Sequence, residues 1–384
     1  MDFSLSEEQL ELKELTHQFA ANEMRPAAAE HDEKNEFAVD VMKKAFEVGF
    51  LTSGIPVEYG GTGFSNLDNA VVCEELAWGC SGMYTSMMAN TLATTPIVYF
   101  GSDEQKKEYL EPITKEMTFA CFGLTEREAG SDNSMIKTTA KKDGDFYILN
   151  GSKTFITNAG VSKLGVIFAS TDKSRGARGL SAFIVPMDTP GVSVGKHENK
   201  MGHRASNTAE IYLDDVKIPA KNLLRREGFG FIIAMKTLDY ARPAVGAGGV
   251  GLARAAYEEA LKYAQNRVQF GKPIASFQHN AFKLAEMITA IDAARLLVHR
   301  SAWMLDNGMK ASKESAMAKV VATDTAMQVT TDAVQILGGY GYMKEYPVEK
   351  MMRDAKLFQI YEGTNEIQKH VISLEILGSV KNVG

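Results

Sequence analysis

The first part of the chain places apolar residues at helical spacing. Leu12, Leu15 and Phe19 fall on one face of a helix, because side chains three to four positions apart lie above one another. Ser6 precedes them, with Gln9 three positions later, which is the pattern of a capping box. The spacing predicts a helix that begins beside Ser6.

Further helix signals follow before the pattern changes. Apolar positions at helical spacing predict helices over residues 37–49 and 66–79, separated by a turn-rich loop at 56–63 that contains four glycine and proline residues in close succession. Ser102 with Gln105 predicts the start of another helix.

From about residue 117 the chain changes to short apolar runs separated by turn dipeptides. Asp143-Gly144 and Asn150-Gly151 are typical of hairpin turns. The runs that predict strands are 119–124, 146–149, 166–168, 182–185 and 211–213. The pattern favours an antiparallel barrel or sandwich.

Beyond about residue 228 long helical patterns return. They cover residues 228–266, 275–307, 312–337 and 346–380, with few prolines. Four long helices bury their apolar faces most simply in a bundle. The expected fold is therefore mainly α with a central β-barrel. Its domains are a helical N-domain (1–116), an antiparallel β middle domain (117–227) and a C-terminal four-helix bundle (228–384).

Composition excludes several classes of protein. Of 384 residues, 45% are hydrophobic and 23% charged, which are the values of a globular chain. The net charge of -6 argues against a basic nucleic-acid surface, and no apolar run is long enough to span a membrane. The cysteines and histidines show no metal-binding or disulfide spacing. The first residues carry no leader signal, so we expect a bacterial cytoplasmic protein, or a mitochondrial matrix protein if the chain is a mature one.

Two segments carry candidate chemistry. Residues 125–132 combine hydroxyl groups with a glycine-containing turn, which suits an anionic ligand such as a pyrophosphate but also fits an ordinary polar turn. Glu362 stands between Tyr361 and Gly363 after an apolar run. Burial there would raise the pKa of its carboxyl towards neutrality, as a general base requires. A surface glutamate at a loop–helix junction is the alternative.

Two glycine-containing helix ends indicate a ligand site less specifically. Residues 335–341 end a helix with glycines, where a cofactor could approach the bare backbone. Arg267 and Phe270, before Gly271, offer a cation and a ring at a turn, although cations are also common where helices end.

Together these segments resemble the acyl-CoA dehydrogenase family along essentially the whole chain, and most of all its medium-chain and short-chain straight-chain members. The motifs that carry the resemblance occur in the family's order and spacing. They are residues 122–132, Phe155-Ile156-Thr157-Asn158, Asp239 with Arg242-Pro243, Arg267 with Phe270-Gly271 and Gln278, residues 335–339, Arg353-Asp354-Ala355 and Tyr361-Glu362-Gly363-Thr364.

The resemblance implies a reaction and its partners. An acyl-CoA thioester is expected to lose its α-proton to a carboxylate and its β-hydrogen, as a hydride, to N5 of FAD, which gives the trans-2-enoyl-CoA. The thioester carbonyl is expected to accept hydrogen bonds from the backbone N–H of the catalytic glutamate and from a flavin ribityl hydroxyl. The family also implies a homotetramer and electron-transferring flavoprotein as the acceptor. We expect no nucleic-acid or membrane partner.

The motif match assigns roles to residues. It makes Glu362 the base that removes the α-proton. It implies cofactor contacts at Phe122, Leu124, Thr125, Ser131, Phe155, Ile156, Thr157, Arg267, Phe270, Gln278, Gln335, Ile336, Gly338, Gly339, Thr364 and Glu366. Those from Arg267 to Gly339 resemble the pyrophosphate and adenine contacts, which a neighbouring subunit supplies in part. It implies substrate contacts at Ser131, Tyr84, Met88, Leu92, Asp239, Arg242, Tyr361 and Gly363, and no metal.

Several positions depart from the family's usual pattern. Arg127 stands where proline is usual, Phe155 where tryptophan is usual and Lys369 where arginine is usual. Some relatives carry their base at the position of Ala241, and alanine cannot act as a base. Met88 replaces a glutamate of the medium-chain type, so we expect an apolar, closed acyl pocket.

The expected substrate is a short- to medium-chain acyl-CoA, with a cyclic or branched acyl group as the alternative. A dicarboxylyl substrate is disfavoured because residues 80–96 contain no arginine to pair with a free carboxylate. A non-catalytic scaffold that binds flavin or acyl-CoA is a second class of function, but it would be expected to lose the base. An oxidase on the same fold is a third, and some of its members use an aspartate base.

Overall fold

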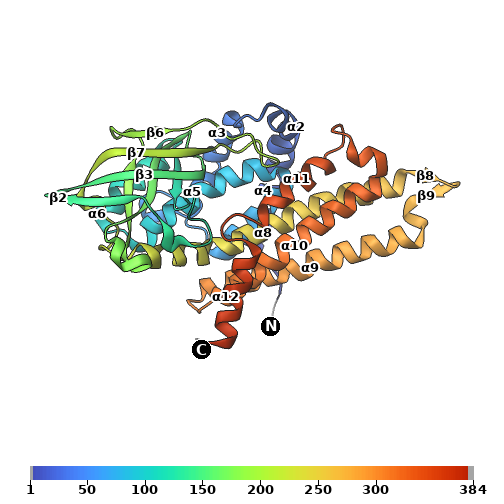
Figure 1. Ribbon diagram of the computed structural model, residues 1–384. Coiled ribbons are helices and arrows are strands. Elements are labelled where there is room, and N and C mark those ends of the chain that lie inside the picture. Colours follow the sequence, from blue (N-terminus) through green and yellow to red (C-terminus); the bar gives the residue numbers. More distant parts are fainter. Residues whose placement is uncertain (1–2, 379–384) are drawn as a thin grey trace.

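The computed structural model describes residues 3–378. A β-sheet occupies one end of an elongated molecule, helices form the centre, and a small hairpin lies at the other end (Figure 1). This is the predicted fold class: a helical N-domain, a curled β-sheet and a helical C-terminal domain.

The N-terminal helices begin where the capping signals predict. The Ser6 hydroxyl accepts from the Gln9 N–H at 3.2 Å, and the Gln9 side chain accepts from the Ser6 N–H at 3.1 Å. Ser102 and Gln105 make the same reciprocal pair. The helices are α1 (Glu7–Phe19), α2 (Arg25–Lys34), α3 (Val39–Glu47), α4 (Asn66–Gly79), α5 (Ser81–Phe100), α6 (Asp103–Tyr109) and α7 (Glu111–Lys115).

The sheet contains seven strands in the order β1-β4-β2-β3-β7-β6, with β5 paired to β4. They are β1 (Phe119–Gly123), β2 (Thr139–Asp143), β3 (Phe146–Thr157), β4 (Ser162–Ser170), β5 (Leu180–Pro186), β6 (Val192–Val194) and β7 (Thr208–Pro219). Most pairings are antiparallel, as predicted. However, β1 runs parallel to β4, and β2 meets β4 in parallel at Thr139 and Ser170, so the sheet is mixed.

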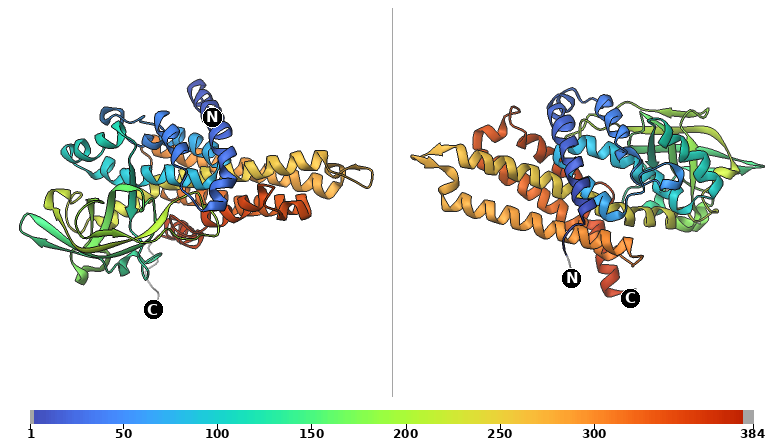
Figure 2. Two further views of the ribbon diagram at one scale, coloured as in Figure 1. Left: turned by 90° about the horizontal axis from the view of Figure 1, so that it is seen from above. Right: turned by 180° about the vertical axis from the view of Figure 1, so that it is seen from behind.

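The C-terminal helices are α8 (Gly230–Asn266), α9 (Gln278–Asp306), α10 (Ser312–Leu337), α11 (Val348–Phe358) and α12 (Asn365–Leu377). The hairpin of β8 (Val268–Gln269) and β9 (Lys272–Pro273) joins α8 to α9 at the far end of the bundle (Figure 2). No helix among residues 3–378 has both the length and the apolar character needed to cross a membrane.

The single helix predicted over 346–380 is wrong, because α11 and α12 are separate. Glu362 and Gly363 between them have φ angles of 52° and 93°, which a right-handed helix excludes. Thr364 then begins α12 by accepting from the Ile367 N–H at 3.3 Å. Residues 379 and 380 of the prediction lie outside the described residues.

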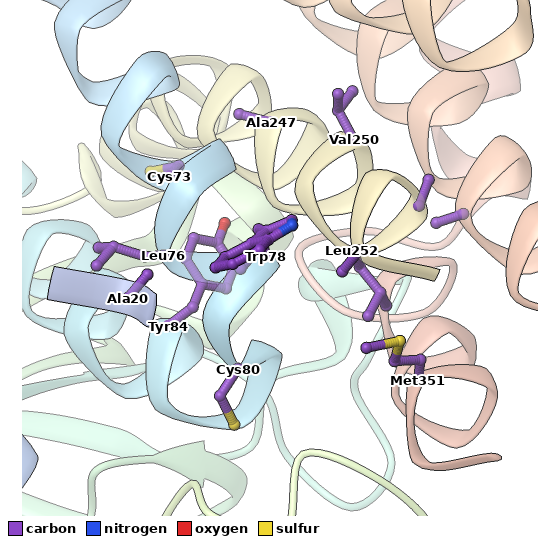
Figure 3. Close-up of a cluster of buried hydrophobic side chains, with 14 of the residues drawn as sticks. Ala20, Cys73, Leu76, Trp78, Cys80, Tyr84, Ala247, Val250, Leu252 and Met351 are labelled. Carbon is purple, nitrogen blue, oxygen red and sulfur yellow. The ribbon is translucent and has the colours of Figure 1, made fainter. Parts of the chain in front are cut away.

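The main core lies where α8 packs against α4, α5 and α10. Figure 3 shows Cys73, Leu76 and Trp78 of α4 with Tyr84 of α5, close to Ala247 and Val250 of α8. The helices touch backbone to backbone: a Cβ at Gly251 would lie 2.0 Å from the Glu74 carbonyl oxygen. This close packing fixes the helices that line the cavity described next.

Candidate active site

A cavity of about 1050 Å³ lies where the sheet meets α5, α8 and the loop between α11 and α12. It brings together most of the residues that the motifs predict. They are Tyr84, Met88, Leu92, Phe122, Leu124, Thr125, Ser131, Phe155, Ile156, Thr157, Arg242, Tyr361, Glu362, Gly363 and Thr364. One chain therefore assembles segments that are more than 200 residues apart in sequence.

Glu362 presents an unpaired carboxyl group to this cavity. Its Oε2 is buried and has no hydrogen-bond partner among the described residues. Burial raises the pKa of the Glu362 carboxyl to about 7, although the positive charges of Lys319 and Arg242 act in the opposite direction. A carboxyl with a pKa near neutrality can both accept and release a proton at physiological pH.

The backbone carbonyls of the loop around Glu362 are hydrogen-bonded, but among the described residues the backbone N–H of Glu362 is not. The Gln368 amide donates to the Gly363 carbonyl at 3.0 Å and to the Glu362 carbonyl at 3.4 Å. Within residues 3–378, no group accepts a hydrogen bond from the Glu362 backbone N–H. That N–H is available to a ligand.

Arg242 and Asp239 form an ion pair at the cavity wall. The Arg242 side chain is buried, and its Nη1 donates to Asp239 Oδ1 at 2.5 Å. The Ser312 hydroxyl donates to the other oxygen of Asp239 at 2.7 Å. Arg242 lines the cavity and Asp239 does not, so Asp239 orients the arginine from behind.

One end of the cavity is apolar and closed by Tyr84. The Tyr84 ring is buried, and its hydroxyl donates to the Ala244 carbonyl of α8 at 2.8 Å. The ring lies so close to α8 that a Cβ on Gly248 would be 2.6 Å from it. The Met88 sulfur contacts the thiol of Cys73 at 3.3 Å. The side chains that form this end, Tyr84, Met88 and Cys73, are uncharged.

The opposite wall is formed by the ends of β1 and β3 and the loop after β1. Phe155 has a φ of 58° and its side chain is 70% exposed, so its ring faces the opening of the cavity. The hydroxyls of Thr125, Ser131 and Thr157 also line this wall. None of these hydroxyls bonds to another residue in the described part of the chain. The wall thus offers a ring face and free hydroxyl groups.

A buried ion pair supports this wall. The Lys153 ammonium is 1% exposed and donates to Glu126 Oε1 at 2.7 Å and to the Leu124 carbonyl at 3.2 Å. The Glu126 carboxylate also accepts from the N–H groups of Lys137 and Thr138. Burial lowers the pKa of Lys153 to about 8. The pair ties the loop after β1 to β3.

A second group of predicted residues does not reach the cavity. Arg267, Ile336, Gly338 and Gly339 line a separate hollow of about 450 Å³. Phe270, 92% exposed with a φ of 51°, projects at the tip of the β8–β9 hairpin (Figure 1). Gln278, Gln335 and Glu366 are exposed and line neither space.

Sequence reasoning missed several residues around the cavity. Tyr99 and Tyr240 stack with ring centroids 4.3 Å apart and line it together. Thr85 lines it and bonds to buried His203. Lys319 lies beneath the Glu362 loop. A lysine among small apolar residues of α10 was the one local signal for Lys319. No group of three or more His, Cys, Asp or Glu side chains in the described chain could hold a metal.

A helical domain, a curled sheet and a second helical domain surround the cavity, and three family models match these parts of the chain in the same order. The N-terminal, middle and C-terminal domain models of acyl-CoA dehydrogenase match residues 6–116, 121–216 and 228–377. The chain belongs to the acyl-CoA dehydrogenase family and is a flavin oxidoreductase.

Named relatives span nearly the full chain. A short-chain specific acyl-CoA dehydrogenase of Clostridium acetobutylicum is 44% identical over 98% of this chain and 100% of its own. An acryloyl-CoA reductase (NADH) of Anaerotignum propionicum is 46% identical over 98% and 96%. A chain solved in work on the electron transferring flavoprotein of Acidaminococcus fermentans has a TM-score of 0.96 and 46% identity, over 98% and 100%.

The residues of the cavity fit the cofactor of this family, FAD. An aromatic ring system needs a flat surface, and Phe155 provides one at the cavity opening. Polar atoms of a flavin need hydrogen-bond partners, and the hydroxyls of Thr125 and Thr157, which bond to no described residue, are open to such a ligand. A Cβ at Gly130 would meet nothing within 4 Å, so the backbone of that loop is open to a close ligand.

Proposed function

We propose that the protein catalyses FAD-dependent α,β-dehydrogenation of a short- to medium-chain acyl-CoA to the trans-2-enoyl-CoA, with Glu362 as the α-proton base. One observation carries the proposal: a carboxyl with no partner for its Oε2 faces a largely apolar cavity, and burial raises its pKa to about 7. Such a group is poised to remove a proton from carbon near neutral pH.

The loop around the base supports the same reaction. Proton loss from the α-carbon places negative charge on the thioester oxygen. The free N–H of Glu362 can donate to that oxygen and stabilise it. Gly363, at a φ of 93°, has no side chain to separate the thioester from the backbone. Base and oxyanion donor therefore belong to one residue.

FAD, when bound, supplies the acceptor for the β-hydrogen, which leaves as a hydride to N5. Phe155, Thr125 and Thr157 would hold the flavin against the cavity, with Ser131 between cofactor and substrate. Arg267, Ile336, Gly338 and Gly339 line a separate hollow, and Phe270, Gln278 and Gln335 line neither space. We assign them to the pyrophosphate and adenine of FAD in a neighbouring subunit of a homotetramer.

The closed acyl end supports a short substrate. Tyr84 fills the space between α5 and α8, and Met88 puts a sulfur where a charge would be needed for a dicarboxylyl group. The similarity to a short-chain specific acyl-CoA dehydrogenase supports butyryl and hexanoyl groups as the acyl part. A cyclic or branched acyl group is the alternative, supported by the stacked tyrosines 99 and 240 that widen the lining with aromatic surface.

The relatives support a direction of the reaction, an electron acceptor and a location. The similarity to a reductase supports a site that also runs in reverse, where protonated Glu362 would return its proton to the α-carbon. Electron-transferring flavoprotein is the proposed acceptor, since a close structural neighbour comes from work on such a protein. The bacterial relatives support a cytoplasmic location. A non-catalytic scaffold is disfavoured because the base is present and unpaired.

Anaerobic reduction of the purified flavoprotein tests the proposal. Butyryl-, hexanoyl-, octanoyl-, palmitoyl-, isobutyryl-, glutaryl- and cyclohexanoyl-CoA are mixed with it in parallel, and the flavin band is followed. Bleaching by butyryl- or hexanoyl-CoA, with none by glutaryl-CoA, is the expected result. A yellow protein that no acyl-CoA bleaches would contradict the reaction, and a colourless protein would contradict the cofactor.

A further inference from the structure

A buried lysine lies directly behind the loop that carries the base. Lys319, on α10, is 0% exposed. Its ammonium group donates to the Gly363 carbonyl at 3.0 Å and to Asn365 Oδ1 at 2.8 Å. Burying an ammonium group is costly unless its hydrogen bonds and charge are compensated. The proposed reaction gives Lys319 no role, so its placement calls for another explanation.

The loop that it contacts has an unfavourable backbone conformation. Glu362 is in the left-handed region at φ 52°, where residues other than glycine are uncommon, and Gly363 follows at φ 93°. Such a conformation persists only where the surrounding structure imposes it. The carbonyl that Lys319 holds belongs to the second of these two residues.

Asn365 extends the same attachment along α10. Its amide nitrogen donates to Thr323 Oγ1 at 3.0 Å and to Asp324 Oδ1 at 2.7 Å. Asp324 also accepts from the Gln359 amide at 2.6 Å, on the other side of the loop. Asp324 of α10 therefore binds residues at both ends of the loop, Gln359 and Asn365, and Lys319 of the same helix binds Gly363 between them.

We propose that Lys319 is a positioning residue for the reaction: its ammonium group holds the 362–365 loop in the conformation that directs Glu362 into the cavity and places a positive charge behind that carboxylate. The inference rests on the proposed role of Glu362. Lys319 forms no direct ion pair with Glu362 among the described residues, and so it acts through the loop and through its field.

The charges around Lys319 fix the sign of the electrostatic effect. Glu362, Asp324 and Glu366 act on it as anions, and Arg242 as a cation. Burial lowers the pKa of Lys319 to about 7, and burial raises the pKa of Glu362 to about 7. The positive charge of Lys319 lowers the pKa of Glu362, and the negative charge of Glu362 raises the pKa of Lys319. Removal of the ammonium charge leaves Glu362 harder to ionise.

The test isolates the base from the hydride step. The holoenzyme binds 3-thiabutyryl-CoA, in which sulfur replaces the β-carbon, so that an α-proton can be exchanged but no β-hydrogen can leave. NMR follows exchange of the α-protons with deuterated water between pH 5 and 9. The proteins are wild type, Glu362→Gln, Lys319→Met, Lys319→Arg and Lys319→Gln. Lys313→Met, an exposed lysine on the same helix, is the matched control.

For Lys319→Met we expect the acid limb of the exchange profile to move up by about one pH unit, with roughly tenfold slower exchange at pH 6. Lys319→Arg restores the charge and returns the limb towards wild type, and Lys313→Met leaves it unchanged. Hydrogen–deuterium exchange of the backbone at residues 358–366 should rise in Lys319→Met alone. If Lys319→Met does not fold, Lys319→Gln, which keeps a hydrogen-bond donor, should still shift the limb.

Two failures are distinguishable. If the acid limb of the exchange profile lies at the wild-type pH in folded Lys319→Met, or in Lys319→Gln, the role of Lys319 is overturned while Glu362 stays the base. Exchange that persists in Glu362→Gln overturns the proposed function itself.

Discussion

Two buried glutamates in this molecule experience opposite electrostatic environments. Glu74 of α4 is 5% exposed and accepts from Arg295 Nε at 2.9 Å and Nη2 at 3.1 Å, with Arg254 Nε at 3.6 Å. Burial alone would raise the pKa of its carboxyl, but the arginines hold that pKa below its ordinary value. Glu362 is buried without such a partner, and its pKa is raised to about 7.

The comparison separates the effect of burial on the pKa of a carboxyl group from the effect of an ion pair. Burial disfavours the charged form of both carboxyl groups, and direct guanidinium bonds reverse the effect only at Glu74. At Glu362 the cations Lys319 and Arg242 act from a distance, so burial dominates. Glu74 is thus a structural group that joins α4 to α8 and α9. We propose that Glu362 is the reactive one.

The largest expected effect is on the reaction at Glu362. Glu362→Gln keeps the shape of the side chain but removes the proton acceptor. We expect flavin and acyl-CoA binding to survive while flavin reduction slows by about 10³-fold, within the range for loss of a general base. Stopped-flow absorbance measures it, with Glu345→Gln, an exposed glutamate, as control. Reduction near the wild-type rate would place the base elsewhere.

At Glu74 the effect should fall on stability instead. Glu74→Gln removes one of the charges that compensate Arg254 and Arg295, which keep Glu75 and Asp292 as partners, and we expect a loss of about 2 kcal/mol in the free energy of unfolding. Activity per folded molecule should stay near wild type. Urea unfolding measures the loss. Glu259→Gln, from a more exposed pair with Arg25, should cost less than about 1 kcal/mol. Equal losses of unfolding free energy in Glu74→Gln and Glu259→Gln would mean that the buried pair stabilises the fold no more than the more exposed one.

A charge introduced into the cavity should disturb the proposed substrate site. Met88→Arg places a guanidinium against Cys73, which itself lies within electrostatic reach of Glu362. We expect kcat/KM for butyryl-CoA to fall by roughly thirtyfold, because a buried guanidinium is costly if it stays unpaired and occupies the base if it pairs with Glu362. Met309→Arg, at an exposed methionine, is the control. Unchanged kinetics in Met88→Arg would show that Met88 does not line the acyl site.

The smallest expected effect is the pH dependence of stability. The folded-state pKa of Glu362 is raised, so the folded protein holds a proton that the unfolded chain releases, and Glu362 destabilises the fold as pH rises from about 4.5 to about 7. Glu74 has a lowered pKa, so its stabilisation is lost as pH falls below about 4.5.

Glu362→Gln should therefore unfold at a higher temperature than wild type at pH 8, and at the same temperature as wild type at pH 4.5. Thermal unfolding at both pH values measures the difference. A gain of the same size at both pH values would mean that the carboxyl charge is not its cause.

Much of the fold could be predicted because its signals are local. Ser6 and Ser102 cap helices through residues three positions away, and the 66–79 and 312–337 patterns give the bounds of α4 and α10. The parallel pairing of β1 with β4 joins strands about 40 residues apart, which no local pattern encodes. The break at residues 359–364 was missed because the apolar pattern continues through it, although Gly363-Thr364 resembles a helix start.

The site residues likewise divide into those that local motifs predict and those that only tertiary packing places. Motif spacing identified Glu362, Thr125 and Phe155, which the cavity brings together. Lys319 and Cys73 approach the loop only through packing of α10 and α4, and their sequence neighbours are ordinary helix residues. Arg267 and Phe270 matched a motif yet lie outside the cavity, and their predicted role depends on a second chain.

The most direct test of the account is the pH dependence of single-turnover flavin reduction by butyryl-CoA. The carboxylate form of Glu362 removes the α-proton, so the account predicts a rate that rises with pH and levels off above a midpoint of about 7. A midpoint near 4.5, the value of an ordinary exposed glutamate, would contradict the claim that an unpaired, buried Glu362 is the base.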